Sequence, residues 1–263
     1  ILDLLLILVI PLGVLGAAIA TLIAQAVSAV LVTVTLMYRT EGMKLCLSQI
    51  RMYKRMLQSI LKIGLPAGFE AIMYSISNII VQVSINNFGV DTMAAWTAYS
   101  KIDFIFWMIN SAFGISVMTF VGQNYGAGKW DRIRRGTKIC LGMALISAVF
   151  VSIILMSAER FLFGIFVNDA GVVEIGIHMM NVIAPAYLLF AFIEVFSGAL
   201  RAQGAVVVST LITMVGICVL RMIWVTLVAA HGTLEQVIIC YPITWAAGAL
   251  AMSIYYIYKQ RKI

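Results

Sequence analysis

The feature that most constrains this chain is a set of long apolar runs without Asp, Glu, Lys or Arg. A helix that crosses a membrane needs about 20 such residues. The sequence of 263 residues is 63% hydrophobic and 11% charged, whereas a soluble domain is about half apolar and about a quarter charged. The sequence therefore predicts an all-α, polytopic membrane protein rather than a soluble domain with a large core. The runs are Leu4–Tyr38, Phe104–Gly128, Ile139–Ala158 and Gln236–Tyr258.

These runs and their polar boundaries predict several membrane helices. Segment 1–13, which contains Pro11 and Gly13, could be either the end of a helix or a re-entrant loop. The first residue is Ile1, and neither the basic lead nor the cleavage site of a signal peptide is present. We therefore expect a fragment whose front is missing. The predicted helices are 14–38, 60–87, 93–124, 135–157, 172–200, 205–230 and 235–258.

The basic residues indicate how these helices are oriented. Lys and Arg concentrate in cytoplasmic loops of membrane proteins. Of the 18 Lys and Arg residues, only Lys101, Arg160 and Arg221 lie outside alternate loops and the C-terminal tail. We therefore expect the basic loops and the C-terminus on the cytoplasmic side of a bacterial inner membrane. The net charge of +7 then reflects topology, and we expect the lipid bilayer as a partner and no nucleic acid.

The same pattern divides the chain into segments. Between the first and second predicted helices lies a short, basic and partly amphipathic stretch, which is typical of a linker helix on the membrane surface. The predicted segments are the end of a first helix bundle (1–38), a cytoplasmic basic linker (39–59), a six-helix transmembrane bundle (60–258) and a cytoplasmic tail (259–263).

Two carboxylates lie inside predicted membrane helices. A charge at bilayer depth costs about 3 kcal/mol on insertion scales and usually faces a cavity or a partner. Glu70 follows Lys62 at a spacing that puts it roughly 12 Å along its helix. Glu194 precedes Arg201 at a spacing that puts it roughly 10 Å along its own helix, measured from the same side of the membrane. Because a shielded carboxylate can exchange a proton or bind Na⁺, we expect Glu70 and Glu194 to couple an ion gradient, of H⁺ or Na⁺, to a conformational change.

Polar and aromatic residues share faces with these carboxylates. Helical spacing puts Tyr74 and Ser77 near Glu70. Such a stripe favours a substrate cavity that contains water, although Ser and Tyr can also simply join neighbouring helices by hydrogen bonds. The corresponding residues near Glu194 are Tyr187, Phe190 and Ser197.

Pro66 lies near the start of the Glu70 helix. It removes a backbone donor and disturbs the carbonyl of Lys62, which can bend a helix. Proline is also tolerated in the first turns, so a bend and an ordinary helix start both remain open.

The remaining candidate residues favour structural roles. Lys101, Asp103 and Arg221 could pair locally or extend toward the membrane surface. The two histidines, His178 and His231, have no nearby ligand partners, and none of the four cysteines forms a CxxC pair, so we expect no disulfide, metal site or other cofactor. The cysteines are Cys46, Cys140, Cys218 and Cys240.

Several stretches resemble the multidrug and toxic compound extrusion (MATE) family, and the resemblance extends through essentially the whole chain. The most specific is GQNYGAGK at Gly122–Lys129, which lacks the spacing of a phosphate-binding P-loop and is typical of a glycine-rich turn at a helix end. The others are Gly13–Gln25, Leu65–Asp103, Phe120–Gly136 and Glu194–Gly204.

The resemblance implies a transporter of twelve helices in two bundles, of which this chain would hold the last helix region of the first and the whole second. It implies antiport, in which a small organic, often cationic substrate leaves as H⁺ or Na⁺ enters. Glu70 and Glu194 match acidic positions of the seventh and tenth family helices. Some members carry the second acid one turn earlier, where this sequence has Phe190. The missing N-terminal bundle would be an intramolecular partner, without which transport is not expected.

Other functions fit the sequence less well. A flippase for a lipid-linked saccharide would need a strongly cationic cavity, which Glu70 and Glu194 oppose. A membrane enzyme would need a catalytic constellation, and the sequence has no HExxH and no Ser–His pair in context. A structural membrane fragment without transport of its own would not need two carboxylates at matching depth.

Overall fold

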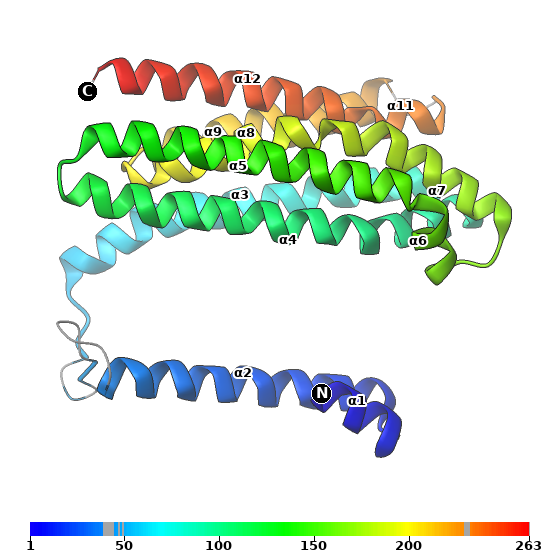
Figure 1. Cartoon of the computed structure of the whole chain (residues 1–263), viewed down its shortest axis with the longest axis horizontal. Helices are drawn as coiled ribbons and strands as arrows, with labels where there is room; N and C mark the ends of the chain where they lie inside the picture. Colours follow the sequence, from blue (N-terminus) through cyan, green and yellow to red (C-terminus); the bar gives the residue numbers. More distant parts are fainter. Residues whose placement is uncertain (39–44, 47, 49, 229–231, 263) are drawn as a thin grey trace. The chain divides into compact units, whose positions relative to one another are not determined.

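The computed structural model describes residues 1–38, 45–46, 48, 50–228 and 232–262 (Figure 1). Arg39, Lys44 and other parts of the predicted 39–59 linker lie outside these residues, as does His231. The chain forms two compact units, Ile1–Gln58 and Ser59–Ile263.

The first unit begins with a short helical turn that folds back on a long helix. Helix α1 (Leu2–Leu4) continues into the π-helical segment η1 (Leu5–Val9), and α2 spans Gly13–Tyr38. The chain reverses at Gly13, which has a positive φ of 54°. The reversal brings the Leu6 carbonyl so close to Gly16 that a Cβ atom there would lie 2.8 Å from its oxygen. The opening segment is therefore a helical turn packed on α2.

The second unit is a bundle of helices that lie side by side (Figure 1), and α3, which leads into it, begins at Lys54. The described residues contain no strand. Its helices are α3 (Lys54–Asn86), α4 (Val90–Gly126), α5 (Trp130–Ser157), α6 (Glu159–Phe166), α7 (Ala170–Ile183), α8 (Tyr187–Ala202), α9 (Val206–Thr213), α10 (Leu220–Ile223), α11 (Leu234–Ile238) and α12 (Cys240–Arg261), with η3 (Ala184–Ala186), η4 (Met214–Val219) and η5 (Trp224–Val228) between them.

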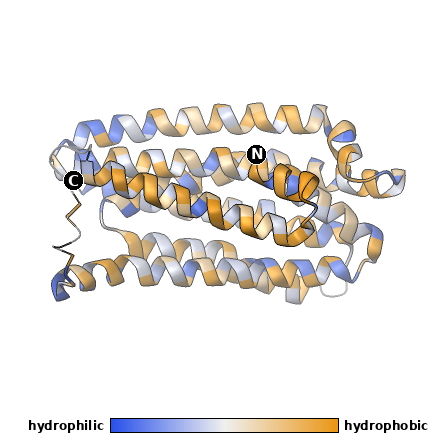
Figure 2. Ribbon diagram, turned by 90° about the horizontal axis from the view of Figure 1, so that it is seen from below, coloured by the Kyte–Doolittle hydropathy of each residue, from blue (hydrophilic) through white to orange (hydrophobic). Residues whose placement is uncertain are grey.

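Seven helices of the described chain are long and apolar enough to cross a membrane, which confirms the predicted all-α, multi-pass architecture. Figure 2 shows hydrophobic residues along most of each long helix and hydrophilic ones near the helix ends. The largest difference from the predicted boundaries is at α3, which begins at residue 54 and not at 60. The seven are Gly13–Tyr38, Lys54–Asn86, Val90–Gly126, Trp130–Ser157, Ala170–Ala202, Val206–Val228 and Leu234–Arg261.

Helix α8 lies at the centre of the bundle and packs against α4, α5 and α12. Two glycines allow the closest approach, between α4 and α8. A Cβ atom on Gly198 would lie 2.7 Å from the Gly114 carbonyl oxygen, and one on Gly114 would lie 2.2 Å from Oε1 of Glu194. Small residues at such crossings let membrane helices pack by van der Waals contact. Gly114 also leaves room for the carboxyl group of Glu194.

Two predicted helices contain irregular turns that the apolar pattern does not reveal. Pro185 lacks an N–H, and the span Ala170–Ala202 tightens there into the 3₁₀ turn η3. The Ser152 hydroxyl of α5 donates to the Ala184 carbonyl at 2.9 Å, which ties this turn to its neighbour. The span Val206–Val228 carries the π-helical segments η4 and η5 on either side of α10. Wide π turns are rare and are frequent at functional sites.

The GQNYGAGK stretch forms the turn between α4 and α5, as predicted. Helix α4 ends at Gly126, Gly128 has a positive φ of 68°, and the Lys129 amide donates to the Asn124 carbonyl at 2.9 Å. A glycine in this conformation is a common helix stop because it has no Cβ penalty.

We predict that Gly198→Ala destabilises the bundle by about 1–3 kcal/mol, the usual cost of overpacking a close contact. The added methyl meets backbone at 2.7 Å, which cannot move aside as a side chain could. Thermal unfolding in detergent measures the effect. Gly122→Ala is the matched control, because its Cβ atom would lie 4.0 Å from that of Ala202. Equal melting temperatures for the two variants would contradict this account of the crossing.

Candidate functional site

A polar stripe runs along α3. Glu70, Tyr74, Asn78 and Gln82 recur every four residues, so they share one face of the helix. This face lines two cavities within the second unit, with Tyr74 contributing to both. From Glu70 to Gln82 the stripe extends roughly 18 Å along the helix axis. The two cavities therefore follow one another along α3.

The first, which we call the carboxylate cavity, has a volume of about 300 Å³. It is lined from α3, α4, α8 and α9. The ionisable residues that line it are Glu70, Glu194 and Arg201, and its other polar residues include Ser197 and Thr213. The structure thus brings the two predicted carboxylates to one site.

Glu70 is held by two neighbouring helices. The Arg201 Nη2 atom lies 2.7 Å from each of its carboxylate oxygens, and Thr210 donates its hydroxyl to Oε2 at 2.9 Å. The Glu70 side chain is 13% exposed and that of Arg201 27%. The ion pair is therefore partly shielded, while the cavity beside it reaches both partners.

Glu194 differs in its contacts. It lies in the middle of α8, where Gly114 leaves the space that its carboxyl group occupies. Within the described part of the chain, its carboxylate has no hydrogen-bond or ion-pair partner. Two carboxylates therefore share one cavity with a single guanidinium, and only one of them is paired with it.

The other predicted site residues divide between the wall of the carboxylate cavity and the buried packing. Tyr74, Phe190 and Ser197 line the carboxylate cavity, and Ser197 also shares a hydrogen bond of 2.9 Å with Ser209. Ser77 and Tyr187 are fully buried in the packing and line neither of the two cavities. Tyr187 instead donates a hydrogen bond to Asp103 and stacks on Phe106.

Pro66 lies about three turns into α3, because the helix begins at Lys54. The chain is helical on both sides of it. The position is therefore inside the helix, and the Lys62 carbonyl cannot receive the usual hydrogen bond from residue 66.

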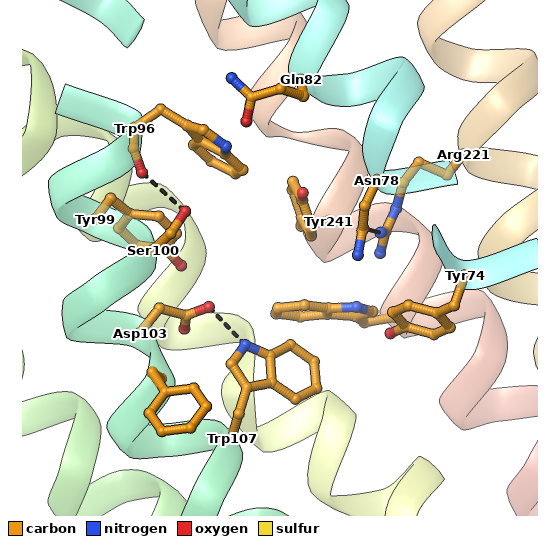
Figure 3. A pocket seen from close by; sticks show the side chains of 12 residues that line it. Tyr74, Asn78, Gln82, Trp96, Tyr99, Ser100, Asp103, Trp107, Arg221 and Tyr241 are labelled. Atoms are coloured by element: carbon orange, nitrogen blue, oxygen red, sulfur yellow. Dashed lines mark hydrogen bonds between the residues drawn. The ribbon is translucent and has the colours of Figure 1, made fainter. Parts of the chain in front are cut away.

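The second cavity, which we call the aromatic cavity, has a volume of about 490 Å³ (Figure 3). It holds Asp103 and Arg221, for which the sequence favoured local pairing or extension to the membrane surface. Arg221 is only 1% exposed, so it does not extend to the surface. Lys101 is exposed and lies outside this cavity. The lining residues are Tyr74, Asn78, Gln82, Trp96, Tyr99, Ser100, Asp103, Phe104, Trp107, Arg221, Tyr241 and Trp245.

Asp103 and Arg221 were not predicted as site residues, although spacing offered a signal. Trp96, Ser100, Asp103 and Trp107 recur at three or four residues on α4 and so share a face. Asn78 and Gln82 extend the Glu70 stripe at the same interval. Counting polar residues along all helices, and not only those near Glu70 and Glu194, would have indicated this second site.

The comparisons with known proteins agree with this architecture. The family profile MatE matches residues 66–227. The chain belongs to the MatE family. Two relatives are the "Probable multidrug resistance protein YoeA" of Bacillus subtilis, with 26% identity over 96% of this chain and 56% of that protein, and the "Multidrug export protein MepA" of Staphylococcus saprophyticus, with 24% identity over 87% and 54%.

The fold matches solved structures of the same family. One is described as the outward-facing conformation of a multidrug resistance MATE family transporter; it superposes with a TM-score of 0.89 at 19% identity, over 99% of this chain and 59% of that one. The chain spans little more than half the length of the curated relatives it matches.

We predict that Glu70 and Arg201 stabilise the bundle as a pair. In a double-mutant cycle of Glu70→Gln and Arg201→Gln, the double variant should lose less stability than the sum of the single variants. The coupling should be about 1–2 kcal/mol: below the 3–5 kcal/mol cost of breaking a fully buried pair, because solvent screens the exposed part of Arg201. Melting temperatures in detergent give the four corners of the cycle. Additive losses would show that the contact contributes nothing.

Proposed function

We propose that this chain is part of a cation-coupled antiporter that exports organic, often cationic compounds across the inner membrane of a bacterium. Membership of the MatE family and the multi-pass architecture support transport. The names of the two curated relatives describe multidrug resistance and multidrug export. A preceding N-terminal bundle would complete the transporter.

The observation that carries this proposal is the charge balance of the carboxylate cavity. Glu70 and Glu194 share it with one guanidinium, that of Arg201. If both carboxylates are ionised, one negative charge remains without a compensating group. In a membrane interior such a charge is costly, so the cavity favours uptake of one cation. Either a proton or Na⁺ can supply that charge, since carboxylate and hydroxyl oxygens are also suitable ligands for a hard cation.

Loading of the cavity would change how α3 is attached. A cation on Glu70 weakens its attraction to Arg201, and protonation converts a carboxylate oxygen from an acceptor into a donor. The contacts to Arg201 and Thr210, which join α3 to α8 and α9, then lose their stabilising charge. A ligand shifts a conformational equilibrium by its different affinity for the two states. Alternating access would follow if the two states differ in this attachment.

The orientation follows from the basic loops. The turn that follows α4 carries Lys129, the last turn of α8 carries Arg201, and α12 also ends in basic residues. Cytoplasmic loops of membrane proteins are rich in Lys and Arg. We assign these turns and the C-terminus to the cytoplasm. The carboxylate cavity then lies in the cytoplasmic half of the bundle and the aromatic cavity in the outer half, since Trp96 and Gln82 lie near the α3–α4 turn.

We predict that Glu70→Gln abolishes ion-driven export in the complete transporter. The substitution keeps the shape and the acceptor for Thr210 but removes the charge that binds the cation. Glu194→Gln should reduce export at least tenfold for the same reason. Everted membrane vesicles with imposed pH or Na⁺ gradients and ethidium as substrate measure both effects and identify the driving ion.

Glu174→Gln is the matched control, because Glu174 undergoes the same chemical change in an exposed ion pair with Arg160. Such pairs contribute little to stability, so export by this variant should equal that of the parent. Amounts of each variant in the membrane are measured in parallel. Ethidium export by Glu70→Gln at the parental rate would refute the coupling role.

A further inference from the structure

An apolar groove lies between α4 and α5, and it shares no lining residue with either of the two cavities. Its volume is about 350 Å³. Phe120, Ile139 and Met143 in its wall are 41%, 54% and 56% exposed, so the groove opens on the outside of the second unit. The apolar side chains that line it, together with Cys140, are those of Phe113, Val117, Phe120, Ile139 and Met143.

The shape and the chemistry of the groove suit a hydrocarbon chain. A Cβ atom on Gly136 would lie 2.1 Å from Cε1 of Phe120, so the missing side chain at Gly136 lets the Phe120 ring lie across α5. The Cys140 thiol donates to the Phe113 carbonyl at 3.7 Å and is therefore already partnered within the protein. Among the described residues that line the groove, none carries a charge.

The groove has the depth of one membrane leaflet. Tyr125 at the end of α4 packs edge-on against Trp130 at the start of α5, with ring centres 5.2 Å apart. Such aromatic residues are enriched at the boundary between membrane and water. Met143 lies roughly 17 Å along α5 from Arg132, and one leaflet contributes about 15 Å of hydrocarbon. The groove thus begins just below the α4–α5 turn and extends toward the middle of the bilayer.

An arginine stands over the end of the groove near this turn. Arg132 precedes Gly136 by four residues, so it lies on the same face of α5, and its side chain is exposed. Neither of the two ion pairs in the described part of the chain involves it. Arg134, in contrast, is directed to α12, where it donates to the Gln260 carbonyl at 3.1 Å. Arg132 is therefore the guanidinium that is available to a ligand in the groove.

Positive charge is concentrated above this groove. Residues 129–138 include five basic residues and one acidic residue, Asp131. At the α8–α9 end of the bundle the basic residue is Arg201, which is paired with Glu70. Clusters of Lys and Arg immediately beside a membrane helix attract anionic lipids, and a guanidinium binds a phosphate through paired hydrogen bonds. The charge over the groove therefore complements an anionic headgroup.

We propose that the α4–α5 groove binds an anionic phospholipid, with one acyl chain along the groove and the phosphate held by Arg132. With the basic turns assigned to the cytoplasm, this lipid belongs to the cytoplasmic leaflet. The site goes beyond the proposed transport function, because it concerns a bound partner from the bilayer and does not depend on ion coupling.

Phosphatidylglycerol and phosphatidylcholine with identical acyl chains are the probes, since they differ in headgroup charge alone. Each carries a photoactivatable diazirine in one chain. Binding to the complete transporter in detergent is titrated by native mass spectrometry, and the cross-linked residues are then identified in peptides. We expect phosphatidylglycerol to bind about fivefold more tightly, which is the effect of one basic residue near an anionic headgroup. Its cross-links should lie within residues 113–143.

Three variants separate the headgroup contact from the groove. Arg132→Gln should weaken binding of phosphatidylglycerol about fivefold and change binding of phosphatidylcholine less than twofold. Arg261→Gln is the matched control, because it removes the same charge from an exposed position at the end of α12; it should change both affinities less than twofold. Ser116→Phe places a ring at an exposed position of the groove wall. It should lower cross-linking of both lipids within residues 113–143 at least threefold, although every basic residue is retained.

Equal affinity of the parent for the two lipids would overturn the proposal, and so would equal losses in Arg132→Gln and Arg261→Gln. Unchanged cross-linking in Ser116→Phe would also overturn it, as would cross-links confined to other helices, because the preceding bundle would then cover the groove. Binding is measured without a gradient, so a failure of the ion-coupling role leaves each of these outcomes unchanged.

Discussion

The ion pair between Glu70 and Arg201 determines how α3 is attached to the second unit, because it joins α3 to α8 where apolar packing does not. From Leu61 to Ile76 no residue of α3 is buried, whereas Ser77, Val81 and Ile85 are. The half of α3 near the α4 turn is thus anchored by packing, and the Glu70 half by polar contacts to Arg201 and Thr210. Packing does not respond to ions, but a carboxylate contact does. Pro66 lies in the half that is attached by charge.

The close crossing of α4 and α8 has a consequence for this site. Gly114 and Gly198 bring the two backbones together, and the absence of a side chain at Gly114 leaves room for Glu194. A larger residue at that crossing would both separate the helices and displace the carboxyl group. Stability and the charge balance of the carboxylate cavity therefore depend on the same pair of small residues.

Much of this fold could be predicted from the sequence, because the need to satisfy every backbone group in lipid leaves helices as the only option for long apolar runs. The seven helices followed from that constraint alone. The turn at Pro185 and the π segments beside Arg221 did not, since local hydrogen bonding and not hydropathy decides them. Among the polar residues near Glu70, the sequence analysis named Ser77, which is buried, but did not consider Asn78, which lines the aromatic cavity. Helical spacing alone allows either residue to face a cavity. Which one does so depends on the helices that pack against α3.

Asp103 and Arg221 show a second limit of prediction from sequence, which is the direction of a charged side chain around its helix. A charge near a helix end can extend to the membrane surface, so position along the helix favours that outcome. Whether it does depends on the direction of the side chain around the helix, which the packing of α4, α10 and α12 sets. Arg221 turns inward because the Tyr241 ring and the Asn78 amide offer contacts there.

Tyr74 joins the aromatic cavity to the carboxylate cavity, since its side chain lies in the walls of both. Because Glu70, Tyr74 and Asn78 follow one another on a single helix, any movement of α3 that releases Arg201 also moves the residue that contacts Arg221. The geometry of α3 thus gives a physical route by which a change in the contacts of one cavity can alter the shape of the other.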